Sequence, residues 1–65
     1  MRIDLNGTPR LIGAHSLAEA LGELGYSGAT IATALNGTFV PTAARSGTPL
    51  HDGDRIEVLA PMQGG

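Results

Sequence analysis

The chain opens with a strict alternation of apolar and polar positions over residues 1–5. This period of two is typical of a strand that buries one face. The Asn6-Gly7 pair that follows suits a tight hairpin turn, because both residue types tolerate a positive φ. Residues 10–13 are then predicted to be the return strand, and Pro9 restricts that strand to a sheet edge or to a strand start.

One helix is predicted after this hairpin. The segment Ser16-Leu17-Ala18-Glu19 is a capping box, in which the serine hydroxyl and the glutamate carboxylate each satisfy a free backbone N–H. An apolar stripe at helical spacing follows, formed by Leu17, Ala20, Leu21 and Leu24. Gly25 is placed to take the left-handed C-terminal cap. Because so short a helix is unstable alone, its stripe must pack on a partner, and a sheet is the expected one.

The second half of the chain begins with another predicted hairpin. Its strands are residues 29–35 and 38–40, and Asn36-Gly37 supplies the turn between them. Pro41 ends the second of these strands. Residues 42–49 are polar and small, and we expect a loop of limited internal order there.

Residues 55–60 form the last predicted strand, which follows a turn at Asp52-Gly53-Asp54. Its alternation places Ile56, Val58 and Ala60 on one face and Arg55, Glu57 and Leu59 on the other. We expect this strand to run parallel beside the first one at the centre of a single sheet, with the helix across one face. Leu59 is then apolar and points outward just before the C-terminal residues, where it is a candidate anchor for partner proteins.

Composition narrows the possible functions. A chain of 65 residues is one small domain that leaves little room for a deep active site. The absence of cysteine excludes disulfides, thiolate metal sites and cysteine nucleophiles. A net charge of −2 without any lysine excludes a Walker-type phosphate loop and argues against a nucleic-acid partner. No apolar run is long enough for a membrane span or a signal peptide, so a soluble cytoplasmic domain is expected.

The titratable residues do not form a credible catalytic or metal site. His15 and His51 are far apart in predicted turns, and solvated histidines are the expected reading. Glu19 and Glu23 share the polar face of the helix without a cleft around them. The Asp52-Gly53-Asp54 turn lacks the remaining ligands of a calcium loop. We therefore expect neither a catalytic residue nor a bound metal in this chain.

The last residues, Gln63-Gly64-Gly65, carry the remaining chemistry. A tail without Cβ atoms at its end can enter a narrow channel of another protein. The Gly65 carboxylate is a poor electrophile, but transfer to the α-phosphate of ATP would convert it into an acyl-adenylate. A sulfur nucleophile could then displace AMP and leave a thiocarboxylate, so that the chain would be a carrier and its partner would supply ATP, magnesium and electrostatics.

Several segments in order along the whole chain resemble the ThiS family, the sulfur carrier proteins of thiamin biosynthesis in the ubiquitin-like β-grasp superfamily. The segments are Asn6-Gly7, Ser16-Leu17-Ala18-Glu19-Ala20-Leu21, Ala34-Leu35-Asn36-Gly37-Thr38-Phe39-Val40-Pro41, Leu50-His51-Asp52-Gly53-Asp54-Arg55-Ile56-Glu57-Val58 and Gln63-Gly64-Gly65. The resemblance implies an α+β fold with a mixed sheet of four to five strands and one helix packed across one face. It implies a β-grasp domain over residues 1–60 and a flexible tail over residues 61–65.

The same resemblance implies the function and its residues. Gly65 would be adenylated by a ThiF-type enzyme, converted to a thiocarboxylate with a sulfur donor enzyme, and used by a ThiG-type thiazole synthase. Gln63 and Gly64 would give the tail access to these partners. Leu59, which is predicted to point outward from the alternation and not from the resemblance, and Met62 are the candidate docking side chains. The chain itself would be no enzyme, would bind no cofactor, nucleic acid or membrane, and would be a monomer when free.

Two other functions stay open at this point. Ala60-Pro61 leans toward the tails of molybdopterin synthase small subunits, which share the Gly-Gly end and the Asp-Gly-Asp turn. Chain length and the Asn36-Gly37 element before Val40-Pro41 favour thiamin over molybdopterin. A non-catalytic β-grasp interaction module, in which the glycines are only a frayed end, is the alternative from another class.

Overall fold

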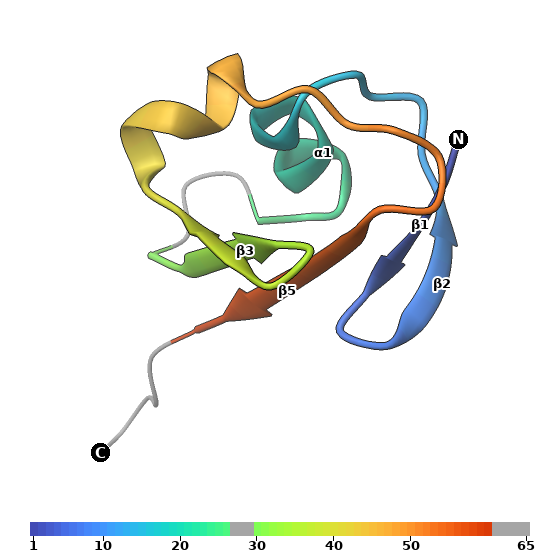
Figure 1. Ribbon diagram of the computed structural model, residues 1–65, viewed down its shortest axis with the longest axis horizontal. Coiled ribbons are helices and arrows are strands. Elements are labelled where there is room, and N and C mark those ends of the chain that lie inside the picture. The colour runs from blue at the N-terminus through green and yellow to red at the C-terminus, as the bar shows by residue number, and fades with distance from the viewer. Residues whose placement is uncertain (27–29, 61–65) are drawn as a thin grey trace.

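A mixed sheet of five strands carries one α-helix on one of its faces in the computed structural model, which describes residues 1–26 and 30–60 (Figure 1). The elements are β1 (Arg2–Leu5), β2 (Thr8–Leu11), α1 (Leu17–Glu23), β3 (Ala32–Leu35), β4 (Thr38–Val40), a 3₁₀ helix η1 (Thr42–Gly47) and β5 (Arg55–Leu59). The strands lie in the order β2-β1-β5-β3-β4. The predicted α+β architecture is confirmed.

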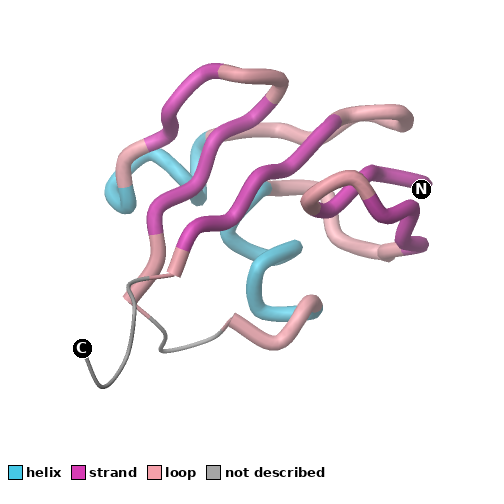
Figure 2. Tube along the Cα trace, turned by 90° about the horizontal axis from the view of Figure 1, so that it is seen from below, coloured by secondary structure: helices cyan, strands magenta, loops and turns pink. Residues whose placement is uncertain are grey.

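The last strand, β5, lies at the centre of this sheet. It runs parallel to β1, with Asp4 beside Arg55 and Leu5 beside Ile56, and antiparallel to β3. Figure 2 shows the β3–β4 hairpin on one side of β5 and the β1–β2 hairpin, near the N-terminus, on the other. The predicted parallel pairing of the first and last strands is therefore confirmed.

Two Asn-Gly turns close the two hairpins. Asn6 and Asn36 both have a φ of 50°, and the glycines that follow both have a φ of 85°. Positive φ at both central residues is the geometry of a type I′ turn, which matches the twist of the flanking strands. The predicted turns are confirmed at both places.

The return strand of the first hairpin begins earlier than predicted. We expected it over residues 10–13, whereas β2 spans Thr8–Leu11. A two-residue turn places Thr8 directly opposite Leu5, so pairing begins there. Pro9 is tolerated opposite Asp4 because β2 is an edge strand.

The helix begins and ends where the capping signals place it. Ser16 is the N-cap and its hydroxyl oxygen accepts a hydrogen bond from the Glu19 backbone N–H at 3.2 Å. The Glu19 carboxylate accepts from the Ser16 hydroxyl at 3.2 Å, and not from the serine backbone as we had predicted. Gly25 has a φ of 97°, which is the left-handed conformation expected after the last turn.

The third strand is shorter than predicted, because a distant arginine binds the backbone just before it. We expected a strand over residues 29–35, but β3 spans Ala32–Leu35, and residue 29 lies outside the described residues. The Ile31 carbonyl accepts a hydrogen bond from Arg45 Nη2 at 2.7 Å. Ala32 is paired with Leu59, the last residue of β5, so the neighbouring strand also ends here.

The segment after β4 is ordered, and the prediction of a loop of limited order over residues 42–49 is wrong for most of it. Residues Thr42–Gly47 form the 3₁₀ helix η1. Arg45 holds this helix against β3, because its Nε donates to Thr33 Oγ1 at 3.2 Å in addition to the bond with Ile31. The Thr48 hydroxyl donates to the Ala44 carbonyl at 2.7 Å at the end of η1.

The core lies between α1 and the inner face of the sheet. Its buried apolar residues are Ile3, Leu5, Ile12, Ala14, Leu17, Ala20, Leu21, Val40, Leu50 and Ile56. Leu24, the last residue of the predicted helix stripe, packs against this cluster while partly exposed. On β5, Ile56 is fully buried and Val58 is half-buried, while Arg55, Glu57 and Leu59 are exposed, as their alternation predicts. The prediction is wrong for Ala60, which lies beyond the end of β5 and is exposed. Burial of this cluster is the main source of stability in so small a domain.

Candidate functional site

The described part of the candidate site is the end of β5. Gly65, Gly64, Gln63 and Met62, which the sequence singled out, lie outside the described residues. Leu59 is described, and it is the last residue of β5. Because β5 is the central strand, the chain reaches residue 60 from the middle of the sheet and not from its edge.

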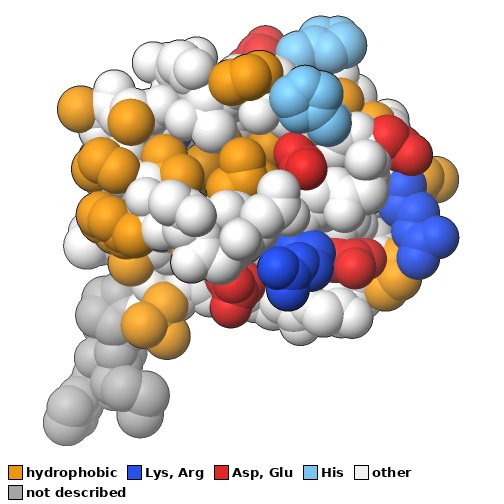
Figure 3. Space-filling view, in the orientation of Figure 1, with side chains coloured by type: hydrophobic (Ala, Val, Ile, Leu, Met, Phe, Trp, Pro, Cys, Tyr) orange, Lys and Arg blue, Asp and Glu red, His pale blue; other side chains and the backbone are white. Residues whose placement is uncertain are grey.

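Leu59 belongs to an exposed apolar surface on the outer face of the sheet, opposite α1. Its side chain is 74% exposed, and Phe39 on β4 is 65% exposed. Ala32 and Ala34 of β3 lie between these strands, with Ala32 paired to Leu59 and Ala34 paired to Phe39. We call Ala32, Ala34, Phe39 and Leu59 the outer apolar patch. In Figure 3 hydrophobic side chains gather on the left, on the side where Figure 1 draws η1 and the β3–β4 hairpin, and most charged side chains lie at the centre and right.

The outer apolar patch forms a shallow groove of about 430 Å³. The small alanine side chains of β3 leave a low floor, and the larger Phe39 and Leu59 side chains stand on either side of it. Glu57 and Asn6 add polar groups to the lining. Such a groove is suited to an apolar side chain of another protein, whose burial would be favourable.

Sequence reasoning missed Phe39 as part of this surface. A signal was available, because a two-residue Asn36-Gly37 turn sets the register of the hairpin. In that register Val40 is paired with buried Thr33, so that Phe39 must point to the opposite face. The prediction from parity that Leu59 points outward is confirmed by its exposure.

A second, polar hollow lies beside the groove. It measures about 400 Å³ and is lined by Asp4, Asn6, Gly7, Arg55, Ile56 and Glu57. Two carboxylates and one guanidinium give it mixed charge, so it has no strong preference for an anion or a cation. We assign no separate chemistry to this hollow.

Asn6 holds β5 from the β1 side through its side chain. Its Oδ1 accepts a hydrogen bond from the Val58 backbone N–H at 2.8 Å, and its Nδ2 donates to the Val58 carbonyl at 3.2 Å. The Asn6 backbone N–H also donates to the Ile56 carbonyl at 2.9 Å. The side chain thus continues the parallel ladder between β1 and β5 beyond the end of β1.

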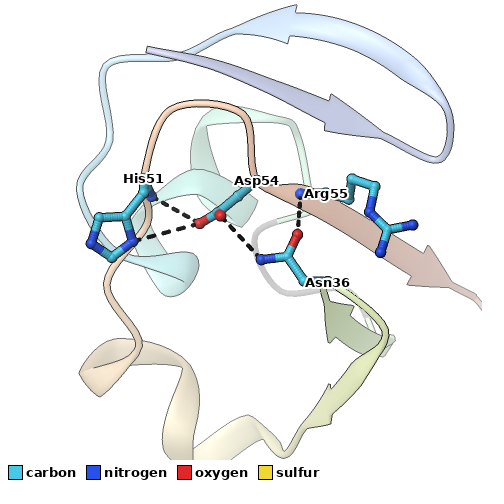
Figure 4. A network of polar contacts seen from close by, with 4 residues as sticks. All are labelled: Asn36, His51, Asp54 and Arg55. Carbon is cyan, nitrogen blue, oxygen red and sulfur yellow. Dashed lines mark hydrogen bonds and ion pairs between the residues drawn. The ribbon is translucent and has the colours of Figure 1, made fainter.

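Asn36 holds the other end of β5 (Figure 4). Its Oδ1 accepts from the Arg55 backbone N–H at 2.9 Å, and its Nδ2 donates to Asp54 Oδ1 at 3.0 Å. Asp54 Oδ2 accepts from the His51 backbone N–H at 2.8 Å and lies 3.9 Å from His51 Nδ1. Burial raises the pKa of Asp54, but the hydrogen bonds from Asn36 and His51 and the His51 ring together outweigh it, so that the pKa lies below its ordinary value.

The other titratable candidates occupy the positions that the sequence predicts. His15 and His51 are exposed, and Glu19 and Glu23 lie on the exposed face of α1. The Glu23 carboxylate accepts a hydrogen bond from the Gly13 backbone N–H at 2.8 Å, which is a structural contact. Within residues 1–26 and 30–60 no three acidic or histidine side chains come close enough to hold a metal ion. The one α-helix in this part of the chain is too short to cross a membrane.

Comparison with protein families gives a match over nearly the whole chain. The model of the ThiS family matches residues 3–65. A sulfur carrier protein ThiS from Thermus thermophilus is 41% identical over 61 residues, which are 94% of this chain and 95% of that protein. A thiazole synthase from Paramagnetospirillum magneticum is 35% identical over 66 aligned positions, which span 100% of this chain but only 20% of that protein.

Solved structures give the same result for the fold. The crystal structure of the thiamine biosynthesis protein ThiS from Geobacter metallireducens has a TM-score of 0.81 and 35% identity, with full coverage of both chains. A solution structure of a thiamine biosynthesis protein from the same organism has a TM-score of 0.80 and 33% identity, and covers all of this chain and 88% of that one. The observed sheet and helix therefore match an experimentally determined fold.

Proposed function

Because the chain belongs to the ThiS family of sulfur carrier proteins, we propose that Gly65 is the residue that carries the sulfur, as a C-terminal thiocarboxylate. The single observation that carries this proposal is the extent of the family match, which runs through Gln63-Gly64-Gly65 to residue 65. The chemistry agrees, because a glycine end without Cβ can reach a reacting group inside a narrow channel. Gln63 and Gly64 serve this access.

Formation of the thiocarboxylate requires two steps on a partner enzyme. In the first, a Gly65 carboxylate oxygen attacks the α-phosphorus of ATP and pyrophosphate leaves, which gives an acyl-adenylate. In the second, hydrosulfide attacks the carbonyl carbon, AMP leaves and the thiocarboxylate is formed. The partner is a ThiF-type enzyme that supplies ATP, magnesium and the preorganised charges, and a sulfur donor enzyme supplies the nucleophile. The chain is a co-substrate of these enzymes and does not catalyse a step itself.

The acceptor of the sulfur is a ThiG-type thiazole synthase. The similarity to a thiazole synthase supports this, because the whole of this chain resembles one segment of that protein. A carrier segment and a synthase that share one polypeptide are expected to work on the same reaction. Sulfur delivered in this way would enter the thiazole ring of thiamin.

The outer apolar patch is the proposed docking surface for these partners. Leu59 and Phe39 are exposed, and Leu59 is the last residue of β5. A partner that covers them gains apolar burial close to the end of β5. Met62, between this patch and Gly65 in sequence, is proposed to add to the same contact.

The test is the intact mass after incubation with ATP, a sulfur source and the cognate activating enzyme. We expect a gain equal to the replacement of one oxygen by sulfur. Deletion of Gly65 should abolish this gain, and so should one residue appended after Gly65. An unchanged mass, with an activating enzyme shown to be active on another carrier, would refute the assignment of Gly65 and favour a plain interaction module.

The alternative function, as the small subunit of molybdopterin synthase, predicts a different behaviour when the chain is purified with its partners. That small subunit uses the same tail chemistry but remains bound to a large subunit. A carrier for thiamin should separate from its partners on gel filtration, and the thiocarboxylate form should support thiazole formation. Copurification as a stable heterotetramer would contradict this reading.

A further inference from the structure

The two Asn-Gly turns have the same backbone but hold different ends of β5. Both asparagines have a φ of 50° and both following glycines a φ of 85°. Each asparagine side chain bonds the backbone of β5, from the β1 side for Asn6 and from the β3 side for Asn36. A turn requires only a residue that tolerates positive φ, so the bonds to β5 are an additional property of these side chains.

The Asn6 amide satisfies both backbone groups of one residue near the end of the strand. Its oxygen accepts a hydrogen bond from the Val58 N–H at 2.8 Å, and its nitrogen donates one to the Val58 carbonyl at 3.2 Å. The β1–β5 pairing itself runs only to Leu5 and Ile56. Among the described residues, Asn6 is therefore the group that holds β5 at Val58 from the β1 side. On the other side, Val58 is paired with Thr33 of β3.

We propose that Asn6 is a positioning residue for sulfur transfer, because its amide fixes the point at which the chain leaves the sheet toward Gly65. This inference rests on the proposed role of Gly65. Residues 59–65 connect Val58 to Gly65, and so short a segment has a limited reach, so the direction of β5 at Val58 restricts the space in which Gly65 can act. A tail that starts from a fixed point loses less conformational freedom when a partner binds it. Asn6 also borders the groove of the outer apolar patch, so the same side chain contacts both the proposed docking surface and the end of β5.

Asn36 provides the matched control. Its side chain bonds Arg55 at the start of β5 and Asp54 before it, so it is remote in sequence from the tail. Replacement of either asparagine by glycine keeps a residue that accepts the φ of 50° and removes only the side-chain bonds. The two variants therefore share the same change in the turn. They differ in the residue of β5 that loses its hydrogen bonds, which is Val58 in Asn6→Gly and Arg55 in Asn36→Gly.

The experiment compares Asn6→Gly and Asn36→Gly in the full chain as substrates of the activating enzyme. We expect Asn6→Gly to raise KM about fivefold to tenfold with an unchanged kcat, since ordering of the tail is then left to the binding step. Asn36→Gly should leave both values close to those of the unchanged chain. Hydrogen exchange of the Val58 amide should be about fivefold to tenfold faster in Asn6→Gly and unchanged in Asn36→Gly.

The outcomes separate the two proposals. If Gly65 of the unchanged chain is not activated, the proposed function fails. Hydrogen exchange of the Val58 amide then still tests whether the Asn6 side chain protects this part of β5. If the unchanged chain is activated and both glycine variants have the same KM, the positioning role is overturned. Should Asn6→Gly fail to fold, Asn6→Asp replaces it, because aspartate keeps the acceptor for the Val58 N–H and loses the donor to its carbonyl. An unchanged KM in Asn6→Asp, in which the bond to the Val58 carbonyl is lost, would equally overturn the inference.

Discussion

Leu59→Asp is expected to weaken partner binding by at least tenfold while the domain stays folded. Full burial of a leucine side chain contributes about 1.5–3 kcal/mol. Since 74% of the Leu59 side chain is exposed, a partner that covers it gains about three quarters of that, or about 1–2 kcal/mol. This alone corresponds to a loss of about 5- to 30-fold in affinity, and a carboxylate forced into an apolar contact adds a desolvation cost.

The domain itself should lose little stability. Leu59 contributes only a minor part of its surface to the fold, so its replacement leaves no cavity in the core. The poor strand propensity of aspartate costs about 1 kcal/mol. Leu11→Asp is the matched control, because Leu11 is 84% exposed and also ends a strand, but on the edge strand β2 at the opposite side of the sheet from β4.

The assay is calorimetric titration of each variant into the activating enzyme, with urea unfolding measured in parallel. We expect a large loss of affinity for Leu59→Asp, an unchanged affinity for Leu11→Asp, and similar unfolding midpoints for both. Equal affinities of the two variants would refute the assignment of the outer apolar patch. A much lower unfolding midpoint for Leu59→Asp alone would show that the side chain supports the fold and not an interface.

Three further predictions concern stability and can all be checked by urea unfolding. Arg45→Ala should lower the free energy of unfolding by about 2 kcal/mol, because the hydrogen bonds from its guanidinium to β3 are lost, whereas Arg10→Ala on the exposed edge strand should change it little. Ile56→Val should cost about 1 kcal/mol, because the methylene it removes is fully buried; a smaller cost than for Arg10→Ala would contradict this. The fold lowers the pKa of Asp54. Its ionised carboxylate therefore stabilises the domain at any pH above the ordinary pKa of an aspartate, and this contribution is lost as the pH falls through the lowered pKa. Asp54→Asn should therefore reduce the loss of stability on acidification, and an unchanged pH profile would argue against it.

The order of elements was predictable because local signals agree with the tertiary structure. Alternation over residues 1–5 and 55–60 predicts the two strands that pair in parallel, and each Asn-Gly pair predicts its hairpin. Capping signals at Ser16 and Gly25 predict the ends of α1. Each of these features depends on residues close to one another in sequence, and such features are the ones a single sequence can show.

The incorrect predictions depend on contacts between distant residues. The order of residues 42–47 and the late start of β3 both follow from Arg45, whose guanidinium reaches Thr33 and Ile31. Nothing in the local sequence around Arg45 indicates which carbonyl it will bind. The same holds for Asn6, since a turn residue is recognisable in the sequence but its bonds to Val58 require the pairing of β1 with β5.

One strand thus serves the fold and the proposed interaction through alternate residues. Ile56 and Val58 face the core, and Val58 is also held by Asn6, whereas Glu57 and Leu59 face outward. Substitutions on the inner positions should therefore change stability first, and those on the outer positions should change binding first. The Val58 backbone connects the two effects, because the bonds that hold it determine where Leu59 and the residues after it lie. A change at Asn6 should alter binding together with hydrogen exchange at the Val58 amide, whereas a change at Leu59 should alter binding alone, and this distinguishes positioning by the strand from direct contact by the patch.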